Sequence, residues 1–393
     1  MPSEISLYIH IPFCKSKCIY CDFFSRPGCE NLIDDYVDAL SSELAFHAEN
    51  LSGTKLKTVY IGGGTPSLLS IEQMNKVFSV IKEKFILDEN DFEFTIELNP
   101  DDVNEELILF LEKSIVTRIS LGIQTLKEET LKFIERRASR KTCVEALLFI
   151  KENFTKRFSV DLISSLPGET ENDVKSTIDE IVKFSPEHIS LYSLCIEENT
   201  KLYRMIQDKK AAFDADYSDA LWIRARDYLK SKGYVQYEVS NFSKDEKARA
   251  RHNLAYWHLK SYIGAGSGAT GTFFYREKDS LRYTNTRDIK QYIEYWKNLS
   301  HCEKIPREEE FIDKHTEEFE YIMMNMRLLD GFSKKDYEER FCMNSTKIFD
   351  EKNDLIKSWM DKKLIEKICK GSDVFYRMTE QGILYLNSFL EKI

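Results

Sequence analysis

The sequence predicts an α/β protein built on a partial (β/α)6 barrel, with an α+β extension and a C-terminal domain of winged-helix type. From residue 5 to about 195, short β-branched runs alternate with longer segments of helical period, as in a parallel sheet wound by helices. Beyond residue 200 this alternation stops. We therefore expect the barrel over residues 1–200, the extension over 201–302 and the C-terminal domain over 303–393.

Six strands are expected in the barrel, namely Ile5–Ile11, Lys57–Ile61, Phe92–Leu98, Arg118–Ile123, Phe158–Ile163 and His188–Ser193. Segments rich in Glu, Lys and Leu, with apolar residues three and four apart, predict helices at Leu32–Asn50, Ile71–Lys84, Glu105–Lys113, Glu128–Glu152 and Glu171–Phe184. In such barrels the chemistry gathers on loops that leave the carboxyl ends of the strands. Each predicted strand does run into or contain candidate residues, in order Cys14–Cys21, Gly62–Pro66, Glu97, Gln124, Asp161 and Cys195.

The extension and the C-terminal domain follow different patterns. The extension should contain a helix near Tyr217–Ser231, an extended segment Gln236–Phe242 and a glycine-rich stretch Gly264–Gly271. The last domain should contain helices at Glu308–Leu329, Lys334–Phe341 and Thr346–Asp361, a hairpin from Leu364 to Met378, and a final helix. Residues 301–393 hold 16 Lys+Arg and 20 Asp+Glu, so this balance disfavours nucleic-acid binding by phosphate neutralisation.

Composition narrows the class of protein further. The chain has 393 residues, 56 Lys+Arg against 66 Asp+Glu, 42% hydrophobic residues and nine cysteines. No apolar run approaches the roughly 20 residues of a transmembrane helix, and the N-terminus lacks the pattern of a secretory signal. We therefore expect a cytoplasmic protein without a transmembrane segment. In a reducing compartment cysteines are more often ligands or nucleophiles than disulfides, and five of the nine, scattered singly, are expected as small core residues.

A tight cysteine trio follows the first predicted strand. Cys14, Cys18 and Cys21 form the pattern C-x3-C-x2-C. Three thiolates can ligate three irons of a [4Fe–4S] cluster and leave the fourth iron open to an exogenous ligand. A zinc site is the alternative, with His10 as its nearest fourth donor, although no second cysteine knuckle follows. A nucleophilic cysteine would leave the other two unexplained.

With Tyr20 as the aromatic residue inside the trio, the motif resembles that of the radical S-adenosylmethionine (SAM) superfamily. The resemblance implies that SAM binds the open iron and, given an electron donor for the cluster, is cleaved reductively to a 5′-deoxyadenosyl radical. The run Gly62–Pro66 after the second strand then acquires a role. Glycines without Cβ allow the backbone to approach the methionine part of SAM.

Further motifs resemble the oxygen-independent coproporphyrinogen III oxidase-like family over nearly the whole chain. They are Leu7–Cys14, the glycine run, Ile123–Gln124, Asp161–Ile163, Leu166–Gly168 and Glu238–Phe242. Matching these motifs implies a SAM pocket lined by Tyr8, Tyr20, Gly63, Gly64, Thr65, Glu97, Gln124, Arg136 and Asp161. An ordinary solvated helix face is the alternative for Arg136. Cys195, Gly268 and Ala138 depart from the family pattern.

Two branches of that family differ in function. The authentic oxidase carries a fourth cysteine two residues beyond the trio, where this chain has Phe23. The branch of HemW-type heme chaperones lacks that cysteine and carries H-N-x-x-Y, which here is His252–Tyr256. The resemblance therefore implies that the protein binds heme through His252 and Tyr256 and delivers it to an acceptor protein.

A neutral histidine is a competent axial ligand of heme iron, although a buried structural histidine is the alternative reading of His252. Lys247, Arg249 and Arg251 are candidate counter-charges for the heme propionates. The alternative functions are oxidative decarboxylation of coproporphyrinogen III in porphyrin biosynthesis and a zinc-stabilised scaffold.

Overall fold

The computed structural model describes residues 2–298, 304–341 and 354–393 of the chain. Six parallel strands stand side by side in chain order, as expected for a partial (β/α)6 barrel. They are β1 (Glu4–Ile11), β4 (Lys55–Gly63), β6 (Glu93–Leu98), β7 (Arg118–Gln124), β8 (Arg157–Ser164) and β9 (His188–Ser193). The short strand β5 (Ile86–Leu87) pairs with the start of β4. All six predicted barrel strands are confirmed, with bounds that differ by two residues at most.

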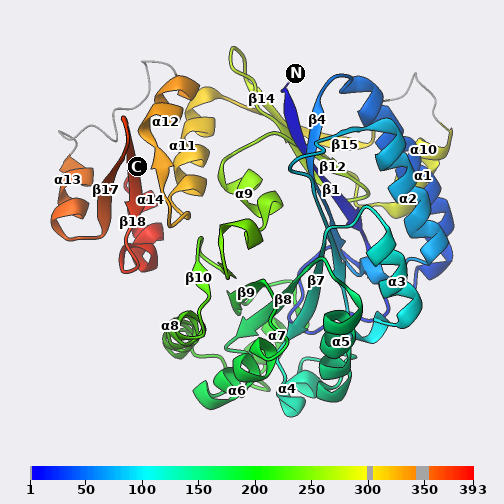
Figure 1. Cartoon of the computed structure of the whole chain (residues 1–393), viewed down its shortest axis with the longest axis horizontal. Coiled ribbons are helices and arrows are strands. Elements are labelled where there is room, and N and C mark those ends of the chain that lie inside the picture. The colour runs from blue at the N-terminus through cyan, green and yellow to red at the C-terminus, as the bar shows by residue number, and fades with distance from the viewer. Residues whose placement is uncertain (1, 299–303, 342–353) are drawn as a thin grey trace.

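The helices of the barrel cover the outer face of the sheet (Figure 1). They are α1 (Ile33–Asn50), α2 (Ile71–Lys84), α3 (Glu105–Lys113), α4 (Glu128–Phe133), α5 (Arg140–Asn153) and α6 (Glu171–Val182). The single helix predicted over Glu128–Glu152 is wrong, because the chain breaks between α4 and α5. Glu135 takes a left-handed conformation with φ 56°, and the Ser139 side chain then caps α5 by accepting from the Thr142 N–H. Side-chain oxygens at such positions accept hydrogen bonds from the free backbone N–H groups of the first helical turn.

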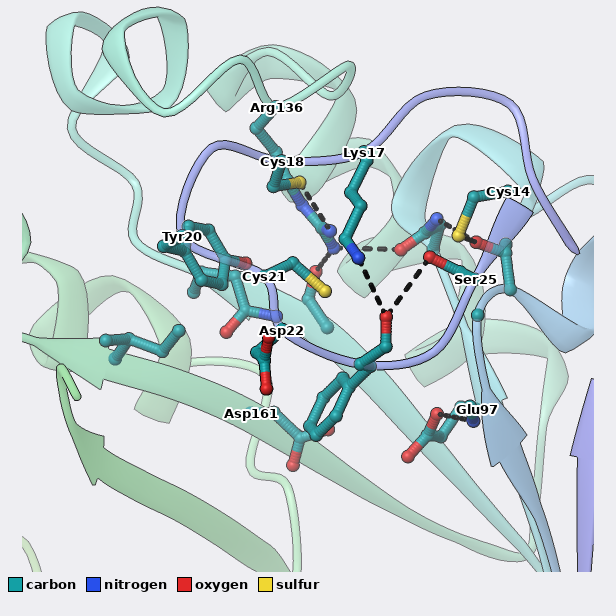
Figure 2. A pocket seen from close by; sticks show the side chains of 18 of the residues that line it. Cys14, Lys17, Cys18, Tyr20, Cys21, Asp22, Ser25, Glu97, Arg136 and Asp161 are labelled. Atoms are coloured by element: carbon teal, nitrogen blue, oxygen red, sulfur yellow. Dashed lines mark hydrogen bonds between the residues drawn. The ribbon is translucent and has the colours of Figure 1, made fainter. Parts of the chain in front are cut away.

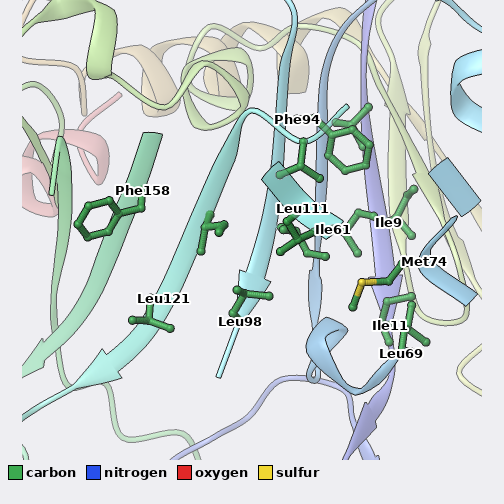
Figure 3. Close-up of a cluster of buried hydrophobic side chains, with 14 of the residues drawn as sticks. Ile9, Ile11, Ile61, Leu69, Met74, Phe94, Leu98, Leu111, Leu121 and Phe158 are labelled. Atoms are coloured by element: carbon green, nitrogen blue, oxygen red, sulfur yellow. The ribbon is translucent and has the colours of Figure 1, made fainter. Parts of the chain in front are cut away.

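Alternation along the strands separates an apolar outer face from a polar inner face. In β1, Leu7, Ile9 and Ile11 are fully buried on the outer side, whereas Tyr8 and His10 point into the barrel. Figure 3 shows the outer side chains of neighbouring strands packed with Met74 of α2 and Leu111 of α3. Burial of this outer face against the helices stabilises the sheet and leaves the inner face available for polar side chains.

The extension lengthens the barrel sheet at both edges. After α7 (Lys201–Gln207) and α8 (Ala215–Ser231), the short strands β10 (Val235–Gln236) and β11 (Asn241–Ser243) form a hairpin, and β11 pairs antiparallel with β9. At the other edge, β12 (Tyr262–Ala265) runs parallel to β1 and continues into β13 (Thr270–Phe273) and β14 (Ser280–Asn285). The predicted extended segment Gln236–Phe242 is therefore part of a hairpin rather than one strand. Between these two edges, the helix α9 (Arg251–Trp257) carries the H-N-x-x-Y motif.

Helix α10 (Ile289–Asn298) packs on α1. The following described segment contradicts a predicted helix: residues 307–312 form β15 (Arg307–Ile312), paired antiparallel with β14, instead of the first turns of a helix over Glu308–Leu329. Arg282 of β14 faces Glu310 across this pair, and opposite charges on facing strands favour the pairing. Helix α11 (Lys314–Asn325) begins only after Asp313, which caps it by accepting from the Thr316 N–H.

The C-terminal part forms its own hydrophobic cluster, which includes Ile322, Trp359 and Phe389. Its elements are α11, β16 (Phe332–Ser333), α12 (Lys334–Phe341), α13 (Asp354–Asp361), the hairpin β17 (Ile365–Lys370) and β18 (Asp373–Met378), and α14 (Leu386–Leu390). The predicted hairpin and the helix Lys334–Phe341 are confirmed. Of the predicted helix Thr346–Asp361, residues 346–353 lie outside the described residues. Across the described ranges, no helix combines the length and apolar character needed to cross a membrane.

Candidate functional site

The cysteine trio lies on the loop that leaves the carboxyl end of β1. This loop runs between two short parallel strands, β2 (Phe13–Cys14) and β3 (Arg26–Pro27), and curves over the ends of the barrel strands (Figure 2). The Phe23 carbonyl accepts from the Lys17 ammonium at 3.0 Å, which closes the loop on itself. Cys14, Cys18 and Cys21 are free, half-buried thiols that line one cavity of about 430 Å³.

The same cavity gathers most of the residues expected around SAM. Of the predicted set, those that line it are Tyr20, Gly63, Gly64, Thr65, Glu97, Gln124, Arg136 and Asp161. Tyr8 is the exception among them, because it lines a neighbouring cavity and its hydroxyl pairs with Nδ1 of His10 at 2.9 Å. Cys195 also borders the main cavity, with its thiol donating to Glu197 Oε1 at 3.1 Å.

Two half-buried carboxyls, those of Glu97 and Asp161, line the cavity. Glu97 Oε1 accepts from the Tyr60 hydroxyl at 2.7 Å, and Glu97 Oε2 accepts from the Gly63 N–H at 3.3 Å. Burial raises the pKa of Glu97 to about 7. Burial also raises the pKa of Asp161, which accepts from the Ser120 hydroxyl at 2.8 Å. Both carboxyls can therefore accept from hydroxyl or amino groups of a ligand at little further desolvation cost.

Arg136 brings a cation to the wall of this cavity. It lies in the turn between α4 and α5 rather than on a solvated helix face, so that alternative is wrong. Its guanidinium donates to Asn99 Oδ1 at 2.9 Å and to the Gly122 carbonyl, and it lies 3.8 Å from the Cys18 sulfur. A cation held in this way can meet a thiolate and a ligand carboxylate.

The glycine run fits tightly against the cysteine loop. The Gly64 N–H donates to the Ile11 carbonyl at 2.8 Å, and a Cβ on Gly64 would lie 2.5 Å from the Phe13 carbonyl oxygen. Gly63 has φ +112°, and a Cβ there would lie 2.5 Å from the His10 ring. The next residue, Thr65, places its hydroxyl 3.2 Å from the Cys14 sulfur. Close backbone approach therefore requires glycine at both positions.

His252 of α9 is buried against the inner face of β4, with a side chain already paired at both ring nitrogens. Nδ1 lies 2.7 Å from the Thr58 hydroxyl, and Nε2 lies 2.9 Å from the Tyr256 hydroxyl. Burial lowers the pKa of His252 to about 3, so the ring is neutral at pH 7. Its ring also stacks on Tyr60, with centroids 5.3 Å apart. The predicted motif thus forms a local network in which neither nitrogen is free.

Two further cavities flank α9. One, of about 490 Å³, lies toward the cysteine loop and includes Tyr8, His252, Tyr256, Gly268 and Arg287 in its lining. The other, of about 660 Å³, lies between α9, the extension strands and α11. Tyr60 borders the first of these and the cysteine cavity, and Tyr192 borders the second and the cysteine cavity. The three cavities therefore adjoin one another.

The cations expected beside heme are placed elsewhere. Arg249 pairs with Asp330, and Arg251 pairs with Asp91. Neither of them, nor Lys247, lines any of the three cavities as far as the structure describes them. Sequence reasoning missed Tyr60, Lys260 and Arg282. Alternation could have found Tyr60, because it lies between the outward-facing apolar residues Val59 and Ile61 of the predicted strand Lys57–Ile61.

Of the three single cysteines that the structure describes, two are not core residues. Cys143 is buried as expected, but Cys195 and Cys369 are exposed. Cys302 and Cys342 lie outside the described residues. At the position of the oxidase's fourth cysteine, Phe23 borders the cysteine cavity with 71% of its surface exposed.

The donor set suits a cluster better than one ion. Among the described residues, no three His, Cys, Asp or Glu side chains are placed to hold a single metal ion. A zinc site needs four donors converging on one point, whereas the cysteines of a [4Fe–4S] cluster bind different irons. Three thiols spaced around one cavity fit the second arrangement.

Comparison with known proteins agrees with this geometry. The model of the radical SAM superfamily matches residues 8–181. The heme chaperone HemW of Buchnera aphidicola (Schizaphis graminum) is 32% identical over 98% of this chain and 97% of its own. HemW of Escherichia coli K12 is also 32% identical, over 98% and 97%. The coproporphyrinogen III oxidase HemN of E. coli superposes with a TM-score of 0.81 over 99% of this chain and 89% of its own, at 19% identity, which supports the fold alone.

Proposed function

Because the chain belongs to the family of HemW heme chaperones, we propose that it binds heme and transfers it to an acceptor protein. The observation that carries the proposal is the adjacency of two sites: a cavity lined by the cysteine trio and the cavities that flank α9. Phe23 in place of a fourth cysteine, together with the H-N-x-x-Y helix, favours this branch over the oxidase. We propose a cytoplasmic location for the protein.

The cysteine cavity is proposed to hold a [4Fe–4S] cluster through Cys14, Cys18 and Cys21, with SAM on the open iron. When bound and reduced by an external electron donor, the cluster supplies one-electron chemistry at the SAM sulfonium. Gly63 and Gly64 present backbone where a Cβ would clash, and Tyr20, Thr65 and Gln124 complete the wall.

The charged residues of this cavity are proposed to orient SAM. Arg136 is positioned to pair with a carboxylate. Glu97 and Asp161 face the cavity from β6 and β8, the strands on either side of β7, and can accept from the ribose hydroxyls or the amino group. Tyr8 lines the neighbouring cavity, where its hydroxyl pairs with Nδ1 of His10 and orients that ring.

Heme is proposed to bind against α9. Tyr256 lines both cavities beside this helix, so a porphyrin on either side of α9 would touch it. Iron ligation by His252 through Nε2 requires its hydrogen bond with the Tyr256 hydroxyl to break, and ligation through Nδ1 requires the loss of its bond with the Thr58 hydroxyl. Aromatic rings at this helix offer the flat apolar contacts that a porphyrin face needs.

Anaerobic reconstitution of one sample tests both the cluster site and heme binding. We expect about four irons per chain, lost in Cys14→Ser and retained in Cys29→Ser, since Cys29 lies outside the trio. Heme titration should give a saturable Soret shift. The chaperone proposal fails if no saturable shift appears, or if reduced protein with SAM decarboxylates coproporphyrinogen III with sustained turnover that depends on Cys14.

A further inference from the structure

Hydrogen bonding distinguishes the two cavities that flank α9. In the larger one, Oε1 of Glu238 and Oδ1 of Asn241 are buried acceptors without a partner among the described residues. Heme cannot satisfy them, because its own polar groups at neutral pH are propionates, which also only accept. In the cavity of about 490 Å³, no lining residue carries such an unpaired buried side-chain atom within the described chain. An anionic, largely apolar ligand therefore fits the smaller cavity better.

Aromatic rings line the smaller cavity. Tyr8 of β1, Tyr60 of β4 and Tyr262 of β12 border it together with α9 and the cysteine loop. That loop contributes Phe23, whose side chain is 71% exposed. Such rings offer flat apolar contacts to a porphyrin, and covering an exposed phenyl ring is favourable. His252 lines this cavity and not the larger one, so a porphyrin here would share the cavity with the histidine of the H-N-x-x-Y motif.

One cation stands at this cavity without an anionic partner. Arg287 follows β14, is exposed and lines the cavity. Its guanidinium carbon lies 5.9 Å from the ring centre of Phe24, which lines the same cavity. Within the described chain, Arg287 makes no ion pair. The neighbouring carboxylate of Asp288 is used elsewhere, because it accepts from the Lys290 and Gln291 N–H groups at 3.0 and 3.1 Å, at the start of α10.

The positive charge of Arg287 is felt inside the cavity. Burial, and to a smaller extent the charge of Arg287, lower the pKa of His10 to about 4, so the His10 ring is neutral at neutral pH. His252 is neutral as well. Among the described lining residues Arg287 alone is then a cation, and Asp22, the carboxyl that also lines the cavity, forms no ion pair with it. A guanidinium without a carboxylate partner beside an apolar cavity suits a ligand that carries a carboxylate.

We propose that heme occupies the cavity between α9 and the cysteine loop and that Arg287 pairs with one of its propionates. The inference rests on the proposed heme-chaperone function and names a residue that recognises and orients the cargo. His252 and Tyr256 come from α9, whereas Arg287 comes from the segment between β14 and α10, so two separate parts of the chain hold the porphyrin. Arg287 is not an iron ligand, because a guanidinium keeps its protons and offers no lone pair.

Heme titration of the reconstituted full chain tests this contact. Arg287→Gln should bind heme roughly fivefold more weakly, as expected for the loss of a partly exposed charge pair. The Soret band of the bound heme should keep its wild-type position, because Arg287 does not ligate the iron. Arg287→Lys should retain most of the affinity, since it keeps the positive charge. Arg287 is exposed, so both variants should fold, which thermal melts verify.

Three controls separate this contact from a general attraction between cations and heme. Arg26 also lies over the Phe24 ring, with its guanidinium carbon 5.5 Å from the ring centre, but it does not line the cavity. Arg26→Gln should therefore keep the wild-type affinity. Heme dimethyl ester, which lacks the charged propionates, should bind the wild type and Arg287→Gln equally. Binding of SAM should be unchanged in Arg287→Gln, because Arg287 does not line the cysteine cavity.

The possible results have distinct meanings. The inference is overturned if Arg287→Gln binds heme as tightly as the wild type, if Arg26→Gln loses as much affinity as Arg287→Gln, or if the ester also binds Arg287→Gln more weakly. An equal loss of SAM binding in Arg287→Gln would overturn it too. If the wild-type protein shows no saturable heme binding, the proposed function itself fails, and that result is distinct from a wrong propionate contact.

Discussion

Tyr60 stacks on the His252 imidazole with ring centroids 5.3 Å apart, while its hydroxyl donates to Glu97 Oε1 at 2.7 Å. One side chain on the inner face of β4 therefore contacts both the cavity of the cysteine trio and the helix that carries the H-N-x-x-Y motif. Its ring and its hydroxyl can be tested separately, because each serves a different site.

We expect Tyr60→Phe to weaken SAM binding to the reconstituted protein by roughly tenfold, the loss of one hydrogen bond to a charged group. The Tyr60 hydrogen bond lowers the pKa of Glu97, so its removal should move SAM binding toward higher pH. Heme affinity should be unchanged, since the ring stack remains. Tyr60→Leu should weaken the binding of both SAM and heme. If Tyr60→Phe loses as much heme affinity as Tyr60→Leu, the ring and the hydroxyl do not serve separate sites.

The glycine run can be tested with a matched pair. Gly63 and Gly53 both have positive φ, +112° and +87°, but only at Gly63 would a Cβ meet a neighbour, the His10 ring. Gly53→Ala should cost about 1–2 kcal/mol from backbone strain alone. Gly63→Ala should cost more and should lower iron incorporation, because displacement of His10 disturbs the cysteine loop through the bond from its Nε2 to the Phe24 carbonyl. Chemical denaturation measures the stability of both variants, and iron analysis measures their cluster content. Equal values for the two variants would contradict the prediction.

The buried pair of Arg118 and Glu93 fixes the start of α9. Their side chains are 2% exposed and lie 3.3 Å apart, Glu93 Oε1 accepts the His252 N–H at 3.0 Å, and Arg118 donates to the Ala248 carbonyl at 2.8 Å. Arg118→Met should destabilise the protein by about 3–5 kcal/mol, because Glu93 is left as a buried unpaired charge.

Adding Glu93→Gln to Arg118→Met should restore part of that stability, measured by urea denaturation. Lys141→Met is the control, since its ion pair with Glu145 is exposed on α5 and should contribute less than about 1 kcal/mol. A double variant no more stable than Arg118→Met would contradict the assigned pairing.

Glu169 should make stability depend on pH. Burial raises the pKa of its carboxyl from 4.5 to about 7. Between these pH values the folded protein holds a proton that the unfolded chain has lost, so stability falls as pH rises through this window. Glu169→Gln should therefore raise the free energy of unfolding at pH 8 by up to about 3 kcal/mol and change it little at pH 4.5. Thermal melts of the variant and the wild type at pH 8 and pH 4.5 measure this change in stability. If the variant shifts the melting temperature equally at both pH values, titration of Glu169 is not the cause.

Local patterns were sufficient for the barrel and for the cysteine loop. β-branched runs and helical periods depend on neighbouring residues, so the six strands and most helices were predicted within a few residues. Two helix predictions failed for tertiary reasons. The helix over Glu128–Glu152 is interrupted where Arg136 turns into the cavity, and the start of the helix over Glu308–Leu329 is a strand because β14 offers a partner.

The sequence by itself determined that three cysteines follow the first strand, that position 23 is not a fourth, and that His252 and Tyr256 lie one helical turn apart. Only the tertiary structure decided what those residues can still bind. It brings Thr58 of β4 to Nδ1 of His252 and stacks the Tyr60 ring on the same imidazole. Such contacts depend on the packing of distant elements, which no local pattern of residues records.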